Sequence, residues 1–129
     1  MIVDASAILA IVFDEPDADR FNRAISDELE DLLMSPVNFI EAAVRSDQRG
    51  EATSEAFDEI IRISAIRLAE VTEQQARIAR EAYRQFGKGN HPAKLNLGDC
   101  FAYALAKARN EPLLFKGDDF RQTDVEAAI

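Results

Sequence analysis

The sequence has few of the residues on which several classes of protein depend. Its 129 residues include one cysteine, one histidine and no tryptophan, with only five glycines and four prolines. The single thiol of Cys100 excludes an internal disulfide and a zinc site built from several cysteines, and it suits a reducing compartment. The single His91 lies in the loop-like run 89–92, which argues against a Ser-His-Asp triad.

Long apolar runs are also missing. No run reaches the roughly 18 residues of a membrane span, and the first residues show neither a basic flank nor a cleavage site. We therefore expect a cytoplasmic protein without a membrane partner. The length fits one domain covering residues 1–129, and 47% hydrophobic residues suffice for one core.

Negative charge dominates the chain, but unevenly. The formal net charge is −9, which disfavours a simple nucleic-acid-binding module. Residues 1–76 carry 6 Lys/Arg and 17 Asp/Glu, whereas residues 77–121 carry 9 Lys/Arg and 5 Asp/Glu. The basic stretch offers a surface for a polyanion if it is contiguous in space, and otherwise it consists of solvated helix faces.

Short apolar runs alternate with amphipathic patterns along the chain. Strands are predicted at 1–3, 32–34, 66–71 and 113–115, and helices at 6–13, 17–28, 36–49, 53–64, 72–86 and 97–109. The predicted helix caps are Ser35 before Pro36, Thr53 or Ser54, Thr72 in a capping box with Gln75, and Asn96. Strands separated by helices indicate an α/β fold with a parallel sheet covered on both faces, whose sites form at the carboxyl ends of the strands.

Five acidic residues occur at strand ends and helix starts. Asp4 directly follows the first predicted strand, and Asp118 and Asp119 follow the last one after a tight turn. Asp99 lies in the first turn of its helix and Glu41 in the second turn of another. Taken singly, each has a structural explanation as a cap, a complement to the helix dipole or a partner of a nearby cation.

Taken together, these acids favour a catalytic interpretation. Several carboxylates cannot stay ionised side by side without a cation, and oxygen ligands without His or Cys select Mg²⁺ or Mn²⁺. The chemistry that such a site performs is attack of a metal-activated water on a phosphodiester. This step assumes that the acids converge.

Four segments occur in a characteristic order. They are MIVDASA at 1–7, Glu41, NLGDCFAY at 96–103 and LLFKGDDF at 113–120. In this order, and over nearly the whole chain, they resemble PIN-domain proteins of the VapC toxin type. The resemblance implies an α/β/α sandwich with a short, mainly parallel sheet. It also implies a Mg²⁺- or Mn²⁺-dependent endoribonuclease acting on RNA such as tRNA or rRNA, a VapB-type antitoxin as inhibitor, and a homodimer.

The resemblance also assigns site residues. Asp4, Glu41 and Asp99 match acidic positions of the family, and Asp119 is preferred over Asp118 as the last acid because it directly precedes Phe120. The implied metal ligands are Asp4, Asp99 and Asp119, with Glu41 completing the acidic shell. Asp118 is then expected to cap the short helix that follows.

Other residues are expected to serve the substrate. Ser6 matches a hydroxyl position near the metal, where it would bond a carboxylate or the phosphate. The residues expected to position the RNA backbone are Lys88, Lys94, Lys116 and Arg121. Asn38 is expected to face solvent, with orientation of Glu41 as the alternative, and Cys100 is expected in the core.

Three other functions stay open at this point. One is a PIN-like nuclease acting on DNA or flap structures, the second is a non-catalytic binding module, and the third is a small-molecule phosphatase. The four acids disfavour the second, and the lack of a Gly-rich phosphate loop disfavours the third. The apolar helix at 8–13 and the helix carrying 57–61 are the expected docking place of the antitoxin, which would send a basic side chain towards the acids.

Overall fold

Four short strands form a parallel sheet at the centre of the molecule. The computed structural model describes residues 1–129 and contains β1 (Ile2–Val3), β2 (Leu33–Met34), β3 (Arg67–Leu68) and β4 (Leu113–Leu114). Their order is β3-β2-β1-β4, and every pairing is parallel. All carboxyl ends of the strands therefore meet at one edge of the sheet.

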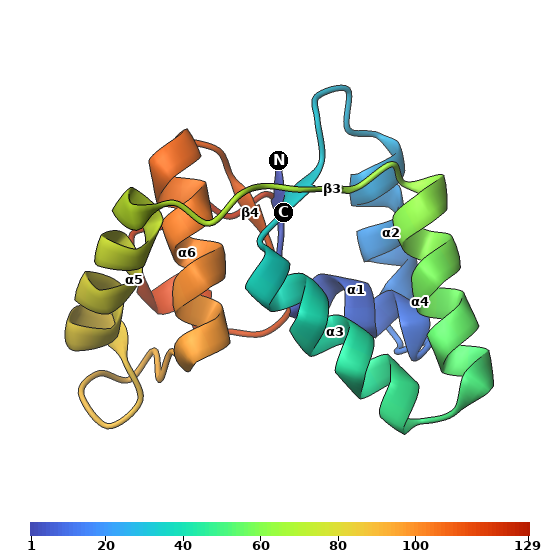
Figure 1. Ribbon diagram of the computed structural model, residues 1–129, viewed down its shortest axis with the longest axis horizontal. Coiled ribbons are helices and arrows are strands. Elements are labelled where there is room, and N and C mark those ends of the chain that lie inside the picture. The colour runs from blue at the N-terminus through green and yellow to red at the C-terminus, as the bar shows by residue number, and fades with distance from the viewer.

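Six α-helices cover the two faces of this sheet. They are α1 (Ala5–Val12), α2 (Ala18–Ser26), α3 (Pro36–Gln48), α4 (Glu51–Ile63), α5 (Glu73–Phe86) and α6 (Leu97–Arg109), followed by a 3-10 turn, η1 (Phe120–Gln122). Helices α5 and α6 lie on one side and α1 to α4 on the other (Figure 1). The predicted α/β/α sandwich with a parallel sheet is confirmed.

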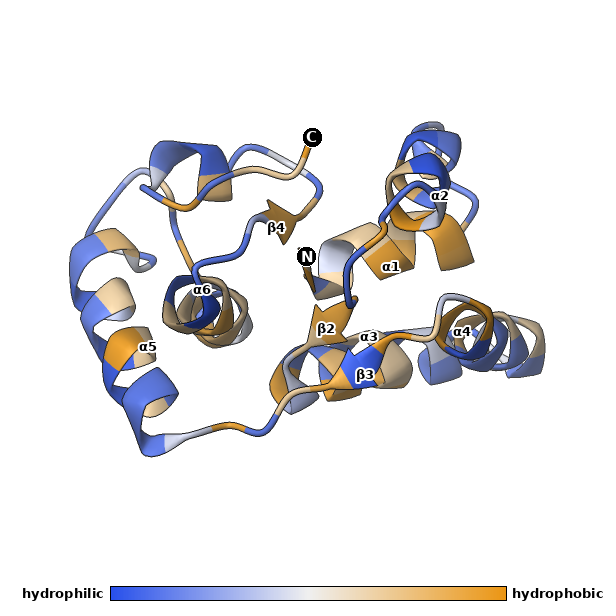
Figure 2. Ribbon diagram, turned by 90° about the horizontal axis from the view of Figure 1, so that it is seen from above, coloured by the Kyte–Doolittle hydropathy of each residue, from blue (hydrophilic) through white to orange (hydrophobic).

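Neighbouring strand residues belong to different halves of the core. Ile2 packs with the side chains of α5 and α6, whereas Val3 packs with those of α1 to α4. Leu113 and Leu114 divide in the same way, because successive side chains of a strand point to opposite faces. Strands β2 and β4 stand out as apolar between the helical layers (Figure 2).

Local capping signals explain several helix starts. The Ser35 hydroxyl accepts a hydrogen bond from the Val37 N–H, with Pro36 as the first helical residue. The Thr72 hydroxyl accepts from the Gln75 N–H as predicted. The second bond of the predicted capping box, from the Thr72 N–H to the Gln75 side chain, is absent, so this part of the prediction is wrong. The Gln75 amide donates to the Glu70 carbonyl instead.

Helix α4 begins earlier than the sequence suggested. Gly50, with a φ of 122°, precedes its first residue, so neither Thr53 nor Ser54 is the cap. The Thr53 hydroxyl instead donates to the Ser46 carbonyl at 2.6 Å, and the Ser54 hydroxyl donates to Asp47. Both predicted caps therefore tie α4 back to α3.

The apolar helix at the start of the chain is an internal element. Ile8 and Leu9 of α1 are buried, and Val12 and Phe13 are only partly exposed. Helices α2, α3 and α4 all pack against α1. Most of its apolar surface is therefore used within the fold, and docking of the antitoxin near this helix and the helix carrying 57–61 stays a prediction.

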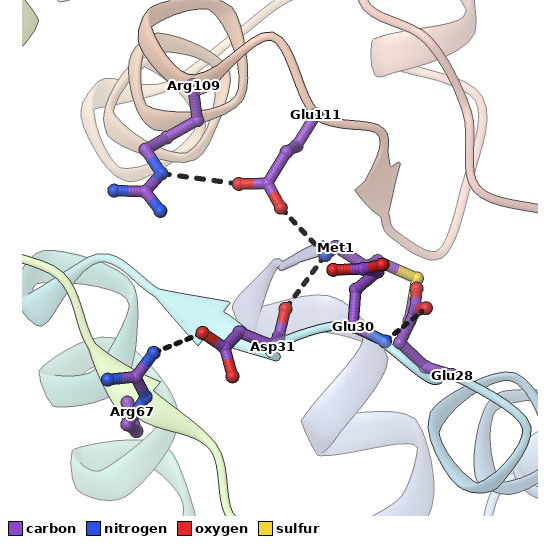
Figure 3. Close-up of polar contacts among 7 residues, drawn as sticks. All are labelled: Met1, Glu28, Glu30, Asp31, Arg67, Arg109 and Glu111. Atoms are coloured by element: carbon purple, nitrogen blue, oxygen red, sulfur yellow. Dashed lines mark hydrogen bonds and ion pairs between the residues drawn. The ribbon is translucent and has the colours of Figure 1, made fainter.

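The edge opposite the carboxyl ends is held by polar contacts. The ammonium of Met1 donates to the Asp31 carbonyl at 2.9 Å and to the Glu111 carboxylate at 3.2 Å. Arg109 contacts the other oxygen of Glu111, and Arg67 contacts the Asp31 carboxylate (Figure 3). These bonds tie all four strands together at that edge. None of the helices has an apolar stretch of the length that crossing a membrane requires.

Candidate active site

A polar cavity of about 170 Å³ opens at the carboxyl ends of the strands. Its walls come from segments that are far apart in sequence: the start of α1, the middle of α3, the start of α6 and the turn after β4. The lining residues are Asp4, Ser6, Glu41, Arg45, Asn96, Asp99, Lys116, Asp119 and Phe120. Four carboxylates from the predicted set therefore face one cavity.

Asp4 is the most buried of these acids, with 3% of its surface exposed. It caps α1, where its Oδ2 accepts hydrogen bonds from the Ser6 N–H at 2.9 Å and the Ser6 hydroxyl at 2.5 Å. Burial raises the pKa of the Asp4 carboxyl, and the bonds from Ser6 only partly oppose this. Its charge is therefore poorly compensated by the protein alone.

The Ser6 hydroxyl links two elements of the site. It donates to Asp4 and accepts a hydrogen bond from the Lys116 N–H at 3.0 Å, just after β4. Of the two expected partners, a carboxylate or a phosphate, the structure pairs Ser6 with the carboxylate. Ser6 thus fixes the position of Asp4 relative to the last strand.

Asp99 stands at the start of α6 within a complete capping box. Its carboxylate accepts from the Asn96 N–H at 2.9 Å, and its own N–H donates to the Asn96 side chain at 2.9 Å. Burial raises the pKa of Asp99 to about 7, and the charges of Asp4, Glu41 and Asp119 add to this rise. Near neutral pH, the metal-free site therefore resists full ionisation.

Glu41 reaches the cavity from α3. Burial raises the pKa of its carboxyl, and the nearby charge of Asp4 raises it further. The first turn of α6 comes very close to this side chain, because a Cβ added to Gly98 would lie 2.5 Å from Glu41 Oε2. A glycine at position 98 therefore lets Glu41 and Asp99 share the cavity.

The two acids after β4 are placed differently. Both acids are exposed, but only Asp119 lines the cavity. The expected cap by Asp118 is wrong, since no side chain caps η1 and Asp119 occupies the position before it. Phe120 is buried against Phe115, with ring centroids 5.1 Å apart, and this packing fixes the rotation of the turn.

The cations around the cavity differ from the expected set. Lys116 lines the cavity, its ammonium pairs with the carboxylates of Glu15 and Asp17, and its contact with RNA stays a prediction. Arg45, one turn after Glu41, also lines the cavity and forms no ion pair.

The remaining predicted substrate residues lie outside the cavity wall. Lys88 and Lys94 are exposed on the loop before α6, and their contact with RNA stays a prediction. The Arg121 guanidinium donates to the carbonyl of Ile129 at 3.1 Å and lies over the ring of Phe115. Arg121 is therefore engaged within the fold.

Two residues that were weighed for chemistry are structural. Cys100 is fully buried, and burial raises the pKa of its thiol to about 11, which confirms a core residue. His91 Nδ1 accepts the Ala93 N–H at 3.0 Å, and the ring packs edge-on against Phe86. Neither side chain lines the acidic cavity.

Asn38 is the largest departure from the expected site. It is fully buried rather than solvent-facing, and its amide Nδ2 lies 3.4 Å from Asp4 Oδ1 and 2.9 Å from the Gly98 carbonyl oxygen. The contact is with Asp4 and not with Glu41. The one sequence feature that pointed to a role for Asn38 in the site was its position one turn before Glu41 on the same helix.

The arrangement has a clear chemical capacity. No three of the carboxylates are placed so that they could hold one metal ion together. Mg²⁺ needs no such set, because it keeps several waters and takes one or two carboxylates directly. The buried Asp4 and the raised pKa of Asp99 show carboxylates that a divalent cation would stabilise. The donor set therefore fits Mg²⁺ or Mn²⁺.

Known proteins are similar to this chain in sequence or in fold. The chain is 46% identical over 127 residues to ribonuclease VapC30 of Mycobacterium tuberculosis, covering 97% of this chain and 95% of the relative. It is 45% identical over 128 residues to a ribonuclease VapC of Mycolicibacterium smegmatis, covering 98% of each. The crystal structure of Mycobacterium tuberculosis VapC20, described as a Sarcin-Ricin loop cleaving toxin, superposes with a TM-score of 0.78 at 17% identity, covering 96% of this chain and 95% of that one.

The match extends to the family as a whole. Residues 1–126 match the PIN domain family, a stretch that includes all five acids of the sequence prediction. Because this covers nearly the whole chain, and because the relatives are aligned over nearly their full length, the chain belongs to the PIN-domain family, within the group of VapC ribonucleases.

Proposed function

We propose that this chain is a Mg²⁺- or Mn²⁺-dependent endoribonuclease toxin, with residues 1–129 acting as one PIN-like domain. The observation that carries the proposal is the meeting of Asp4, Glu41, Asp99 and Asp119 in one cavity at the carboxyl ends of parallel strands. The names of the relatives favour RNA over DNA as the substrate. A non-catalytic binding module would have no use for several destabilised carboxylates in one place.

Each acid has a proposed role in this site. Asp4 and Asp99 would hold the cation directly, and Asp119, the third expected ligand, would complete the acidic shell with Glu41, through water. When bound, the cation supplies an activated water and stabilises the added charge on phosphorus. Ser6 keeps Asp4 oriented through its two hydrogen bonds. The raised pKa of Asp99 lets the metal-free site hold a proton near neutral pH, and that proton leaves when the cation binds.

The substrate meets cations at and beyond the cavity rim. Arg45 lines the cavity near Glu41 and forms no ion pair, so we assign it to the scissile or a neighbouring phosphate. Lys88 and Lys94, exposed on the loop before α6, are proposed to contact the RNA backbone further along. Contacts of this kind give affinity without sequence choice.

The protein partners follow from family membership. We propose that a VapB-type antitoxin neutralises the toxin and places a basic side chain in the acidic cavity, where it would replace the cation. Exposed apolar side chains on α3, Ile40 and Val44, are proposed to lie in a homodimer interface.

The decisive experiment is cleavage by the purified chain. Total bacterial RNA is incubated with the protein and Mn²⁺ or Mg²⁺, and new 5′ ends are mapped by sequencing. Discrete cuts are expected, with none in excess chelator and none for Asp4→Asn. The matched control is Asp58→Asn, because Asp58 is exposed on α4 and does not line the cavity. Full cleavage in excess chelator would refute the metal mechanism, and cleavage of a DNA substrate alone would refute the choice of RNA.

A further inference from the structure

Asn38 occupies an unusual position beside the acidic cavity. It is fully buried on α3, and the same amide nitrogen is placed to donate to Asp4 Oδ1 and to the carbonyl of Gly98. Its own Oδ1 is buried as well and has no hydrogen-bond partner. Buried polar atoms are nearly always paired, so an unpaired one next to an active site calls for a reason.

The two acceptors determine how the amide is oriented. Both Asp4 Oδ1 and the Gly98 carbonyl oxygen accept hydrogen bonds, so only the NH₂ end of Asn38 suits them. Turning the amide over would place its oxygen against both acceptors. The unpaired Oδ1 is the direct consequence of serving them with the two N–H groups.

The bonds of Asn38 connect the elements that carry the site. Ser6 holds Oδ2 of Asp4, and Asn38 reaches Oδ1 of the same carboxylate. The bond to Gly98 joins α3 to the first turn of α6, one residue before Asp99. Asp4 and Asp99 are therefore set relative to each other through one neutral side chain.

We infer that Asn38 is a positioning residue, which holds the carboxylates of Asp4 and Asp99 at the separation that one divalent cation requires. This inference rests on the proposed function, because it names what holds the same site in place. As an uncharged donor, Asn38 orients Asp4 without neutralising it, whereas a Lys or Arg there would compete with the cation.

A purely structural role makes a different prediction. A residue that only filled space between α3 and α6 could be replaced by Leu, which has no polar atom to leave unpaired. Asn38→Leu should then keep every property of the site. A positioning residue predicts a variant that still folds in chelator but loses affinity for the cation and cleavage.

The test compares Asn38→Leu and Asn38→Ala with the wild-type chain. Thermal unfolding is first measured in chelator, then with increasing Mn²⁺ to obtain the apparent affinity, and cleavage of total bacterial RNA is followed at saturating Mn²⁺. We expect both variants to fold in chelator with a lower melting temperature than wild type, because Asp4 Oδ1 and the Gly98 carbonyl lose their donor. The Mn²⁺ affinity and the cleavage rate should each fall at least tenfold.

Ser46→Ala is the matched control. Ser46 is a buried polar residue on the same helix, bonded to the Ala42 carbonyl at 2.8 Å and outside the cavity. This variant should lose some thermal stability and keep its Mn²⁺ affinity and cleavage. If Asn38→Leu or Asn38→Ala keeps both within twofold, or if neither variant folds, the positioning role is overturned. If wild type itself neither binds Mn²⁺ nor cleaves RNA, the proposed function fails instead.

Discussion

Replacing Asp99 with Asn removes one charge from the acidic cavity and leaves the local structure intact. An Asn side chain retains an oxygen that can accept the Asn96 N–H, so the capping box of α6 survives the change. What disappears is a carboxylate whose pKa is raised to about 7 by burial and by three neighbouring acids. The metal-free Asp99→Asn protein should therefore be more stable than wild type at neutral and higher pH.

The size of the effect follows from the pKa. A carboxyl pKa raised from 3.8 to about 7 corresponds to about 4 kcal/mol of destabilisation once the group is ionised. Asp99 is only half-buried, so screening by water reduces this to about 1–2 kcal/mol. The favourable effect of an acid at a helix start, about 0.3–1 kcal/mol, opposes it but is smaller.

The pH dependence has a definite sign. Between the unfolded and the folded pKa of Asp99, the folded chain binds more protons than the unfolded chain, so the stability of wild type falls as pH rises from about 4 to about 7. The Asp99→Asn protein does not lose stability in this way, because residue 99 no longer titrates. The two proteins should be equally stable near pH 4, and the variant should gain steadily up to about pH 8.

Thermal unfolding in excess chelator tests this directly. About 1 kcal/mol corresponds to about 4 °C for a chain of this length, so Asp99→Asn should melt up to about 7 °C above wild type at pH 8. Asp99→Ala is the companion variant, because losing the capping acceptor costs about 1 kcal/mol and offsets the gain. A variant that is less stable at pH 8, or a difference independent of pH, would show that the helix dipole dominates and that the carboxylate is not strained.

Three further results are expected from the geometry. At saturating Mg²⁺, Asp119→Asn should abolish cleavage while Asp118→Asn remains active, because only Asp119 lines the cavity. The reverse pattern would assign the role of the fourth acid to Asp118. If both variants remain active, neither acid is part of the mechanism. Lys116→Met should lower the urea midpoint at low salt, since two carboxylates lose their cation, and an unchanged midpoint contradicts this. Tyr103→Phe should cost about 1 kcal/mol at pH 7, since it loses a 2.6 Å bond to Asp124. That bond lowers the pKa of Asp124 below its ordinary value of 3.8, so in urea unfolding the loss should shrink as pH falls below that ordinary value, and a pH-independent loss argues against the bond.

The sequence predicted best what neighbouring residues determine. Ser35 and Asn96 cap their helices because the bonds they accept come from residues two or three positions away. Short apolar runs placed the strands, although β3 is reduced to Arg67–Leu68 because the rest of the predicted run has no strand partner. Short-range chemistry and periodicity were enough for the architecture.

The missed features depend on contacts between distant segments. The partners of Lys116 are Glu15 and Asp17, about a hundred residues earlier in the chain, and no local sequence pattern predicts these ion pairs. Asn38 was judged by its place near a helix start, where an Asn commonly faces solvent, yet the approach of α6 buries it. The list of acids and, through the position before Phe120, the choice of Asp119 over Asp118 came from the sequence, but only the fold shows that Arg45 lines the same cavity.

The features that weaken this fold gather in one place. The buried Asp4, the raised pKa values of Glu41 and Asp99, and the unpaired Oδ1 of Asn38 all lie around the same cavity. Among buried side-chain polar atoms, only one other, Oε1 of Gln75, lacks a partner. A sequence selected for folding alone would have paired these groups or replaced them with apolar ones. Their concentration at the carboxyl edge of the sheet favours a site that becomes complete when a cation binds, and it disfavours a scaffold that only keeps the shape of its relatives.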